Sequence, residues 1–273
     1  MDPHERACVA DMTEADAYAD FYEAAPPALR DRFGLRVARV ADAVALLAPK
    51  LPTPMFNRAM GFGLAVAATA PALEAIGAVY RAGGVSSWWL HWNPYARPGA
   101  FPDQLRARGF TEARRRAWAK MLRDAAPAPD LPTDLSIGEV ADETAAVQTA
   151  DAIVRVFEMP PPLAGWVACL HGRPGWRLYA VRDGAEIVGG GALFVRETRA
   201  WLGLGAVLPT HRRRGGQGAL MARRIADAVA LGARQLVTET GEAVGDEPNP
   251  SLGNMFRCGF ERVASRLNFA APG

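Results

Sequence analysis

The sequence predicts an α/β protein with two domains, each a mixed, mostly antiparallel sheet flanked by helices. The 273 residues are enough for two domains of ordinary size, and 50% of them are hydrophobic, so each domain can bury a core. Strand patterns alternate with helix patterns through both halves. A stretch rich in alanine and proline, residues 126–132, separates the halves as a linker. We therefore expect domains at 1–125 and 133–273.

The first half is expected to alternate helices with three strands. Residues 1–10 have the composition of a loose start, and residues 13–50 have the apolar spacing of two helices, the second over 36–47. Prolines at 52 and 54 break this pattern. The remaining predicted helices lie at 72–82 and 102–109, and the predicted strands at 56–64, 86–92 and 111–123.

The second half is expected to be built around an antiparallel run of three strands. A hairpin turn is predicted at 182–185, where Asp-Gly separates two apolar stretches. The predicted strands are 135–140, 176–181, 186–195, 199–208, 235–240 and 261–269. The predicted helices are 145–157, 163–171, 219–231 and 251–258.

An internal repeat connects the two halves. Gly61-Phe62-Gly63 corresponds to Gly203-Leu204-Gly205, Ala72-Leu73 to Ala219-Leu220, and Arg108-Gly109-Phe110 to Cys258-Gly259-Phe260, at separations of 142, 147 and 150 residues. The separation grows by five where the second half carries a loop rich in arginine and glycine. We interpret this as two copies of one domain; chance recurrence of Gly-Phe pairs is the alternative.

That loop, residues 212–218, lies between a predicted strand and a predicted helix. Its sequence is Arg-Arg-Arg-Gly-Gly-Gln-Gly. Glycines let successive backbone N–H groups point at one place, and the helix behind adds the positive end of its dipole. Arginines add charge-assisted contacts to phosphate. The loop therefore favours a pyrophosphate site, and the alternative is a solvated basic turn at a helix start.

The segment resembles the acetyl-CoA loop of the GNAT acetyltransferase superfamily. In that pattern, Arg/Gln-x-x-Gly-x-Gly/Ala opens the long central helix, and here Arg212 and Gly215 fit it, with Gln217 at the last small position. A frame shifted by one residue, Arg213-x-x-Gly216-x-Gly218, fits it literally. The resemblance is specific over 131–273, and over 1–125 it rests on the repeat. It implies a degenerate first copy that does not bind CoA.

The resemblance also implies which residues hold acetyl-CoA. The strand before the loop would bind the pantetheine arm through its backbone, with the N–H of Val207 as the oxyanion donor. For Ser251 and Asn254, a helix cap and a surface position are the alternative reading. The implied cofactor-binding residues are Ala206, Val207, Leu208, Arg212, Arg213, Arg214, Gly215, Gly216, Gln217, Gly218, Ala219, Ser251 and Asn254.

Acetyl transfer to an amine needs a base and a proton for the leaving thiolate. Glu239, on the strand after the central helix, is the candidate base; a solvated carboxylate is the alternative. Glu242, Asp246 and Glu247 in the following loop could attract a cationic amine. Where the family carries its tyrosine acid, this sequence has Met255, which cannot donate a proton. The general acid therefore stays unassigned.

Composition narrows the remaining possibilities. A net charge of +2 argues against a chain built for nucleic acid. Three widely spaced cysteines and a polar N-terminus fit a cytoplasmic protein rather than a secreted or membrane one. The four histidines show no metal-ligand spacing. We expect an N-acetyltransferase that acts by direct attack in a ternary complex with acetyl-CoA, as monomer or homodimer. The alternatives are a non-catalytic acyl-CoA binding or sensing module and a scaffold. The acceptor amine cannot be read from this sequence.

Overall fold

The chain folds into two compact units that do not follow the sequence halves. The computed structural model describes residues 1–51, 53–242 and 249–272, and for residues 114–116 the backbone alone. The first unit contains residues 1–121 together with C-terminal segments from 239 and from 262 onward, and the second contains 122–238 and 249–261. A division into 1–125 and 133–273 therefore assigns these C-terminal segments to the other unit. The reason is strand pairing, because residues 267–270 pair antiparallel with Trp89–Trp92 of the first unit.

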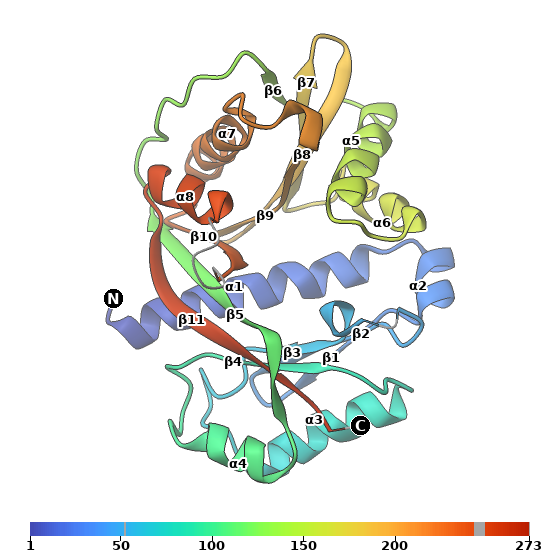
Figure 1. The fold of residues 1–273 in the computed structure, drawn as a ribbon, viewed down its shortest axis with the longest axis vertical. Helices are drawn as coiled ribbons and strands as arrows, with labels where there is room; N and C mark the ends of the chain where they lie inside the picture. Colours follow the sequence, from blue (N-terminus) through green and yellow to red (C-terminus); the bar gives the residue numbers. More distant parts are fainter. Residues whose placement is uncertain (52, 243–248, 273) are drawn as a thin grey trace. The chain divides into compact units, whose positions relative to one another are not determined.

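The first unit contains a sheet whose strands run in the order β1-β2-β3-β4-β11-β5. Figure 1 shows α1 on one side of strands β1–β4 and α3 with α4 on the other. The helical elements are α1 (Pro3–Ala24), α2 (Pro27–Phe33), η1 (Pro54–Phe56), α3 (Ala70–Ala82) and α4 (Phe101–Ala107). The strands are β1 (Arg36–Val40), β2 (Ala43–Leu47), β3 (Arg58–Met60), β4 (Trp89–Trp92), β5 (Thr111–Asp124) and β11 (Glu261–Ala270).

Two expectations for the N-terminal region were wrong. Residues 1–10 are not loose, because Asp2 and Glu5 form a reciprocal capping box that starts helix α1 at Pro3. Residues 36–47 form the hairpin β1–β2 instead of a helix. All five residues of β2 are buried, so this strand lacks the alternation of a half-exposed strand and its apolar run imitates a helical face.

A buried cluster of charged side chains attaches α1 to the rest of the first unit. Glu14 on α1 pairs with Arg266 of β11 and, at 2.6 Å, with Lys120 of β5. Asp11 pairs with Arg266 at 3.1 Å, and Glu239 with Lys120 at 3.3 Å. Burial alone would raise the pKa of Glu14, but the charges of Arg266 and Lys120 outweigh it and hold the pKa well below the usual range.

The second unit contains a sheet in the order β10-β9-β8-β7-β6. Its helical elements are α5 (Glu143–Val156), η2 (Pro161–Leu163), α6 (Ala164–Ala168), η3 (Pro209–His211), α7 (Gly216–Ala230) and α8 (Pro250–Arg257). Its strands are β6 (Ser136–Glu139), β7 (Trp176–Asp183), β8 (Glu186–Arg196), β9 (Arg199–Val207) and β10 (Gln235–Gly241). The helices and strands expected from the sequence in this half are present, with α6 shorter than predicted.

Helices α5 and α7 cover opposite faces of this sheet (Figure 1). Two neighbouring glycines of β8 show this directly. A methyl group at Gly190 would lie 2.3 Å from Thr149 of α5, whereas one at Gly191 would lie 2.9 Å from Arg224 of α7. Larger side chains on β8 would therefore push the helices away from the strands.

Strand β9 is irregular in the part that leads to the loop. Its register with β8 shifts between the pairs Gly190↔Ala206 and Ala192↔Gly203, so β9 holds one extra residue there, and Leu204 has a φ of 54°. The parallel pairing of β9 with β10 joins Arg199–Trp201 to Gln235–Val237. Beyond Trp201 the backbone of β9 is therefore not engaged in this parallel ladder, and the candidate site forms here.

Candidate acetyl-CoA site

The loop before α7 and the start of that helix present backbone amides to one side. Gly215 precedes the helix with a φ of 81°, and Arg213 has a φ of 63°, both in the left-handed region. The first helical bond runs from the N–H of Ala219 to the oxygen of Gly215, at 3.0 Å. The three amides before Ala219 have no partner within the helix, so the helix start suits an anion.

The glycines of this loop also have a packing role that the sequence did not reveal. A methyl group at Gly215 would lie 2.2 Å from the carbonyl oxygen of Pro132, and one at Gly216 would lie 2.8 Å from Leu135. The segment before β6 therefore lies directly against the start of α7. Substitutions at Gly215 would disturb this packing, so they are poor probes of ligand binding.

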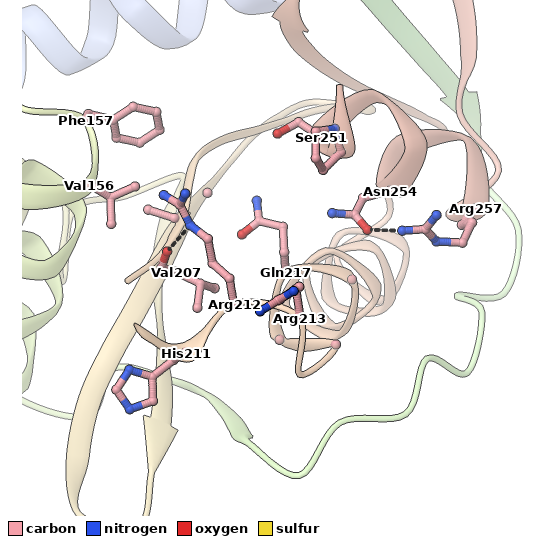
Figure 2. Close-up of a pocket in the computed structure, with 16 residues that line it drawn as sticks. Val156, Phe157, Val207, His211, Arg212, Arg213, Gln217, Ser251, Asn254 and Arg257 are labelled. Carbon is pink, nitrogen blue, oxygen red and sulfur yellow. Dashed lines mark hydrogen bonds between the residues drawn. The ribbon is translucent and has the colours of Figure 1, made fainter. Parts of the chain in front are cut away.

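A pocket of about 720 Å³ opens at the end of β9, in front of the start of α7. Figure 2 shows Gln217 pointing into it, with Phe157 to one side and Asn254 to the other. Among the described residues, three arginines and no carboxylate line it. The lining residues are Val156, Phe157, Gly205, Ala206, Val207, His211, Arg212, Arg213, Gly215, Gly216, Gln217, Gly218, Pro250, Ser251, Asn254 and Arg257.

The backbone of Val207 faces away from β8. The N–H of the next residue, Leu208, donates to the oxygen of Val188 at 2.9 Å, and N–H directions alternate along a strand. The carbonyl of Val207 accepts a bond from Nε of Arg212 at 3.2 Å, on the side away from β8 (Figure 2). The N–H of Val207 therefore points to the same open side, as an oxyanion donor in this pocket would.

The three arginines of the loop have different surroundings. Arg212 and Arg213 line the pocket. Arg214 instead bonds to Asp134 at 2.6 Å and to Asp183 at 2.6 Å, and it lowers the pKa of both carboxyl groups. Leu208, Arg214 and Ala219 are expected site residues that are not among the lining residues, whereas the other ten cofactor-binding candidates are.

The candidate base and the residue at the expected acid position lie outside the pocket lining. The side chain of Glu239 is 7% exposed and belongs to the charged cluster of the first unit, beside Lys120. Met255 is 5% exposed and buried. Cys258 is buried too, and burial raises the pKa of its thiol, which does not suit a nucleophile. Asp246 and Glu247 lie outside the described residues.

Solved structures similar to this one identify the fold. A GCN5-related N-acetyltransferase from Kribbella flavida superimposes with a TM-score of 0.67 at 17% identity, over 96% of both chains. One from Sphaerobacter thermophilus gives 0.62 at 16% identity, over 90% of this chain and 85% of that one. The chain has the GCN5-related N-acetyltransferase (GNAT) fold. No protein-family model matches it, and no curated protein matches it in sequence.

A tandem GNAT protein from the clavulanic acid biosynthesis pathway is also similar. Its TM-score is 0.59 at 16% identity, with 85% of this chain and 79% of that chain covered. This supports the interpretation of the internal repeat as two GNAT-like domains. In the part of the chain that the structure describes, no helix is long and apolar enough to cross a membrane, and no group of three or more potential metal ligands occurs.

By the sequence repeat, residues 65–71 take the place of the arginine-rich loop in the first half, and a carboxylate accepts hydrogen bonds from backbone amides at the start of this segment. Asp42 accepts bonds from the N–H groups of Gly63, Ala65 and Val66, at 3.2, 2.9 and 3.0 Å. At the start of α3, Thr69 caps the helix and a proline removes a further donor. The amides of Gly63, Ala65, Val66 and Ala72 are therefore already engaged, and Pro71 has none to offer an anion.

Sequence reasoning missed several residues that line the pocket. Val156 and Phe157 come from the end of α5, and Phe157 is an exposed aromatic residue, 48% accessible. Arg257 lies one turn after Asn254 on α8 and donates to its side-chain oxygen. Asn254 and Arg257 are three residues apart on a predicted helix, and this spacing could have indicated that Arg257 lies beside Asn254. Nothing in the sequence placed the end of α5 beside β9.

Proposed function

We propose that this chain is an acyltransferase that moves an acetyl group from acetyl-CoA to an amine of a small molecule or peptide. The observation that carries the proposal is the pocket between the open part of β9 and the start of α7, whose described lining residues include three arginines and no carboxylate. That charge pattern suits a ligand with several phosphates and an extended arm. The GNAT fold supports the same reaction class.

Each part of the pocket has a role in this proposal. The amides at the start of α7, with Arg212 and Arg213, would hold the pyrophosphate. The open backbone of β9 would pair with the amide groups of the pantetheine arm, as an added strand does. The N–H of Val207 would polarise the thioester carbonyl, which lowers the barrier for attack by the amine. Ser251 and Asn254 would contact the arm from α8.

The amine must lose a proton, and Glu239 is the proposed base. Its carboxylate pairs with Lys120 at 3.3 Å, and in this proposal it would take the amine proton directly or through water. An exchange of Glu239 for Gln should then lower the rate with each amine and leave acetyl-CoA binding intact. Equal rates for this variant and the unchanged protein would remove Glu239 from the mechanism.

A second candidate function is non-catalytic binding of acyl-CoA. The absence of tyrosine, cysteine and carboxylate among the described residues that line the pocket favours it, because His211, which lies 3.5 Å from Asp183, is then the one titratable side chain of that described lining able to act as an acid. Sensing would need the pocket but no turnover.

Release of CoA thiol from acetyl-CoA, followed with a panel of primary amines, tests the two functions against each other. Turnover that depends on an added amine supports the transferase. Tight binding of acetyl-CoA without amine-dependent turnover across aminoglycosides, polyamines, amino acids and peptide N-termini would support the binding module. A protein that neither binds nor turns over acetyl-CoA would contradict both.

A further inference from the structure

Arg224 is a buried cation directly behind the wall of the pocket. It lies on α7, two turns after Gln217, and only 1% of it is exposed. Its guanidinium donates to the carbonyl oxygens of Ala192 on β8 and Gly203 on β9, at 3.0 and 2.9 Å. These two residues form the pair at which the register of β8 and β9 shifts. Arg224 therefore holds the bulge of β9 in place.

Two glycines provide the space for this guanidinium. A methyl group at Gly191 would lie 2.9 Å from Nη1 of Arg224, and one at Gly205 would lie 3.1 Å from Nη2. Gly205 itself lines the pocket. The methyl group at Gly205 would also lie 2.9 Å from the side-chain amide nitrogen of Gln217. The backbone of β9 and the side chain of Gln217 therefore separate the positive charge of Arg224 from the pocket.

None of the carboxylates that the structure describes forms an ion pair with Arg224. In the described part of the chain its hydrogen-bond partners are three carbonyl oxygens, those of Leu220, Ala192 and Gly203. Burial lowers the pKa of Arg224 to about 10, so the group is still charged at neutral pH. The hydrogen bonds to Ala192 and Gly203 explain a donor at this position, but they do not require that the donor carries a positive charge. Packing alone therefore does not explain an arginine here.

We propose that Arg224 is a positioning residue for acyl transfer, which fixes the bulge of β9 and places a buried positive charge where it stabilises the departing CoA thiolate. The inference rests on the proposed function. In the reaction, the amine nitrogen forms a bond to the carbonyl carbon, the carbon–sulfur bond breaks, and its electron pair leaves on sulfur. The amine proton passes to the base, and the thiolate later takes a proton from water.

This role of Arg224 would compensate for the tyrosine acid that the sequence lacks. Met255 stands at the expected acid position and is buried. The described lining residues include no tyrosine, cysteine, lysine or carboxylic acid, and their one histidine, His211, lies 3.5 Å from Asp183. A fixed charge in a poorly hydrated wall acts more strongly than the same charge in water. A thiolate stabilised in this way can leave before it is protonated.

The pKa of the thiol of bound CoA measures this effect without turnover. We would first titrate the protein with CoA by calorimetry and then follow the ultraviolet absorbance of the thiolate against pH, with desulfo-CoA as the blank. Arg224→Met removes charge and donors, Arg224→Gln keeps donors without charge, and Arg224→Lys keeps the charge. Arg223→Met, the loss of an exposed arginine next to it, is the matched control.

The proposal predicts that both neutral variants raise the thiol pKa by about one unit, a tenfold change in ionisation. Arg224→Lys and Arg223→Met should stay near the unchanged protein. The Gln variant keeps the test valid if the Met variant does not fold. CoA that binds with the same thiol pKa in the unchanged protein and the Gln variant would overturn this inference and leave the proposed function standing. No binding of CoA to the unchanged protein would overturn both.

Discussion

At the scale of single residues, adjacent arginines differ in role, because two of them line the pocket and the third is paired with carboxylates. Arg213 lines the pocket with a left-handed backbone, whereas its neighbour Arg214 is committed to two carboxylates. The sequence alone does not distinguish three adjacent arginines, so all three were predicted to bind the ligand. Only the position of Asp134 and Asp183 in space distinguishes them.

Arg213→Gln is expected to weaken acetyl-CoA binding about tenfold, or about 1.4 kcal/mol, because a charge-assisted contact to phosphate is lost. Arg223→Gln removes one positive charge from α7 outside the pocket and should change the affinity by less than about twofold. Equilibrium titration at two salt concentrations measures both. An equal effect of the two substitutions would mean that overall charge, and not a contact at Arg213, attracts the ligand.

At the scale of elements, most of the second half could be predicted and part of the first half could not. The hairpins β7–β9 and helix α7 follow from local alternation, turns and helical spacing. Strand β2 could not be recognised, because burial on both faces is a property of the assembled sheet. The place of β11 beside β4 could not be recognised either, since it depends on pairing between residues far apart in sequence.

Helix α1 depends on its buried charges. Glu14→Gln is expected to destabilise the protein by about 3 kcal/mol at pH 7, because Arg266 and Lys120 lose a charged partner in the interior. Glu23→Gln on the exposed side of the same helix is the control. Urea unfolding at pH 7 measures both. A change of under about 0.5 kcal/mol in the Glu14 variant would contradict the importance of this cluster.

The effect of Glu14→Gln on the free energy of unfolding should depend on pH. The folded-state pKa of Glu14 lies below its unfolded value of about 4.3, so ionisation favours folding. This stabilisation is complete above about pH 5 and is lost as pH falls through the unfolded pKa toward the folded one. The gap in stability between the unchanged protein and Glu14→Gln should therefore narrow in unfolding curves below about pH 4. A gap that stays constant would contradict the shifted pKa.

The loop of the first domain makes a further prediction at this scale. Asp42→Ala leaves three amides of residues 63–66 without their carboxylate and should cost about 1–3 kcal/mol of unfolding free energy. Asp103→Ala, which removes an exposed ion pair on α4, should cost less than about 1 kcal/mol. Chemical unfolding followed by circular dichroism compares them. Equal small effects would show that water replaces Asp42 without loss.

At the scale of the whole molecule, two domains of the same fold are expected to differ in their capacity to bind acetyl-CoA. The sequence repeat indicated the duplication, and the missing arginine-rich loop suggested that the first copy is degenerate. The structure adds a physical reason, because Asp42, Thr69 and a proline use or remove the amides at the corresponding place. One ligand site per chain is therefore expected, in the second unit.

Calorimetric titration with acetyl-CoA tests the central claim most directly. We predict one site per chain in the unchanged protein and no measurable binding when Arg212 and Arg213 are both changed to Gln, in a variant whose circular dichroism matches the unchanged protein. Two sites per chain would contradict the account of the first domain. No binding to the unchanged protein, or binding that survives the double substitution, would contradict the assignment of the pocket between β9 and α7.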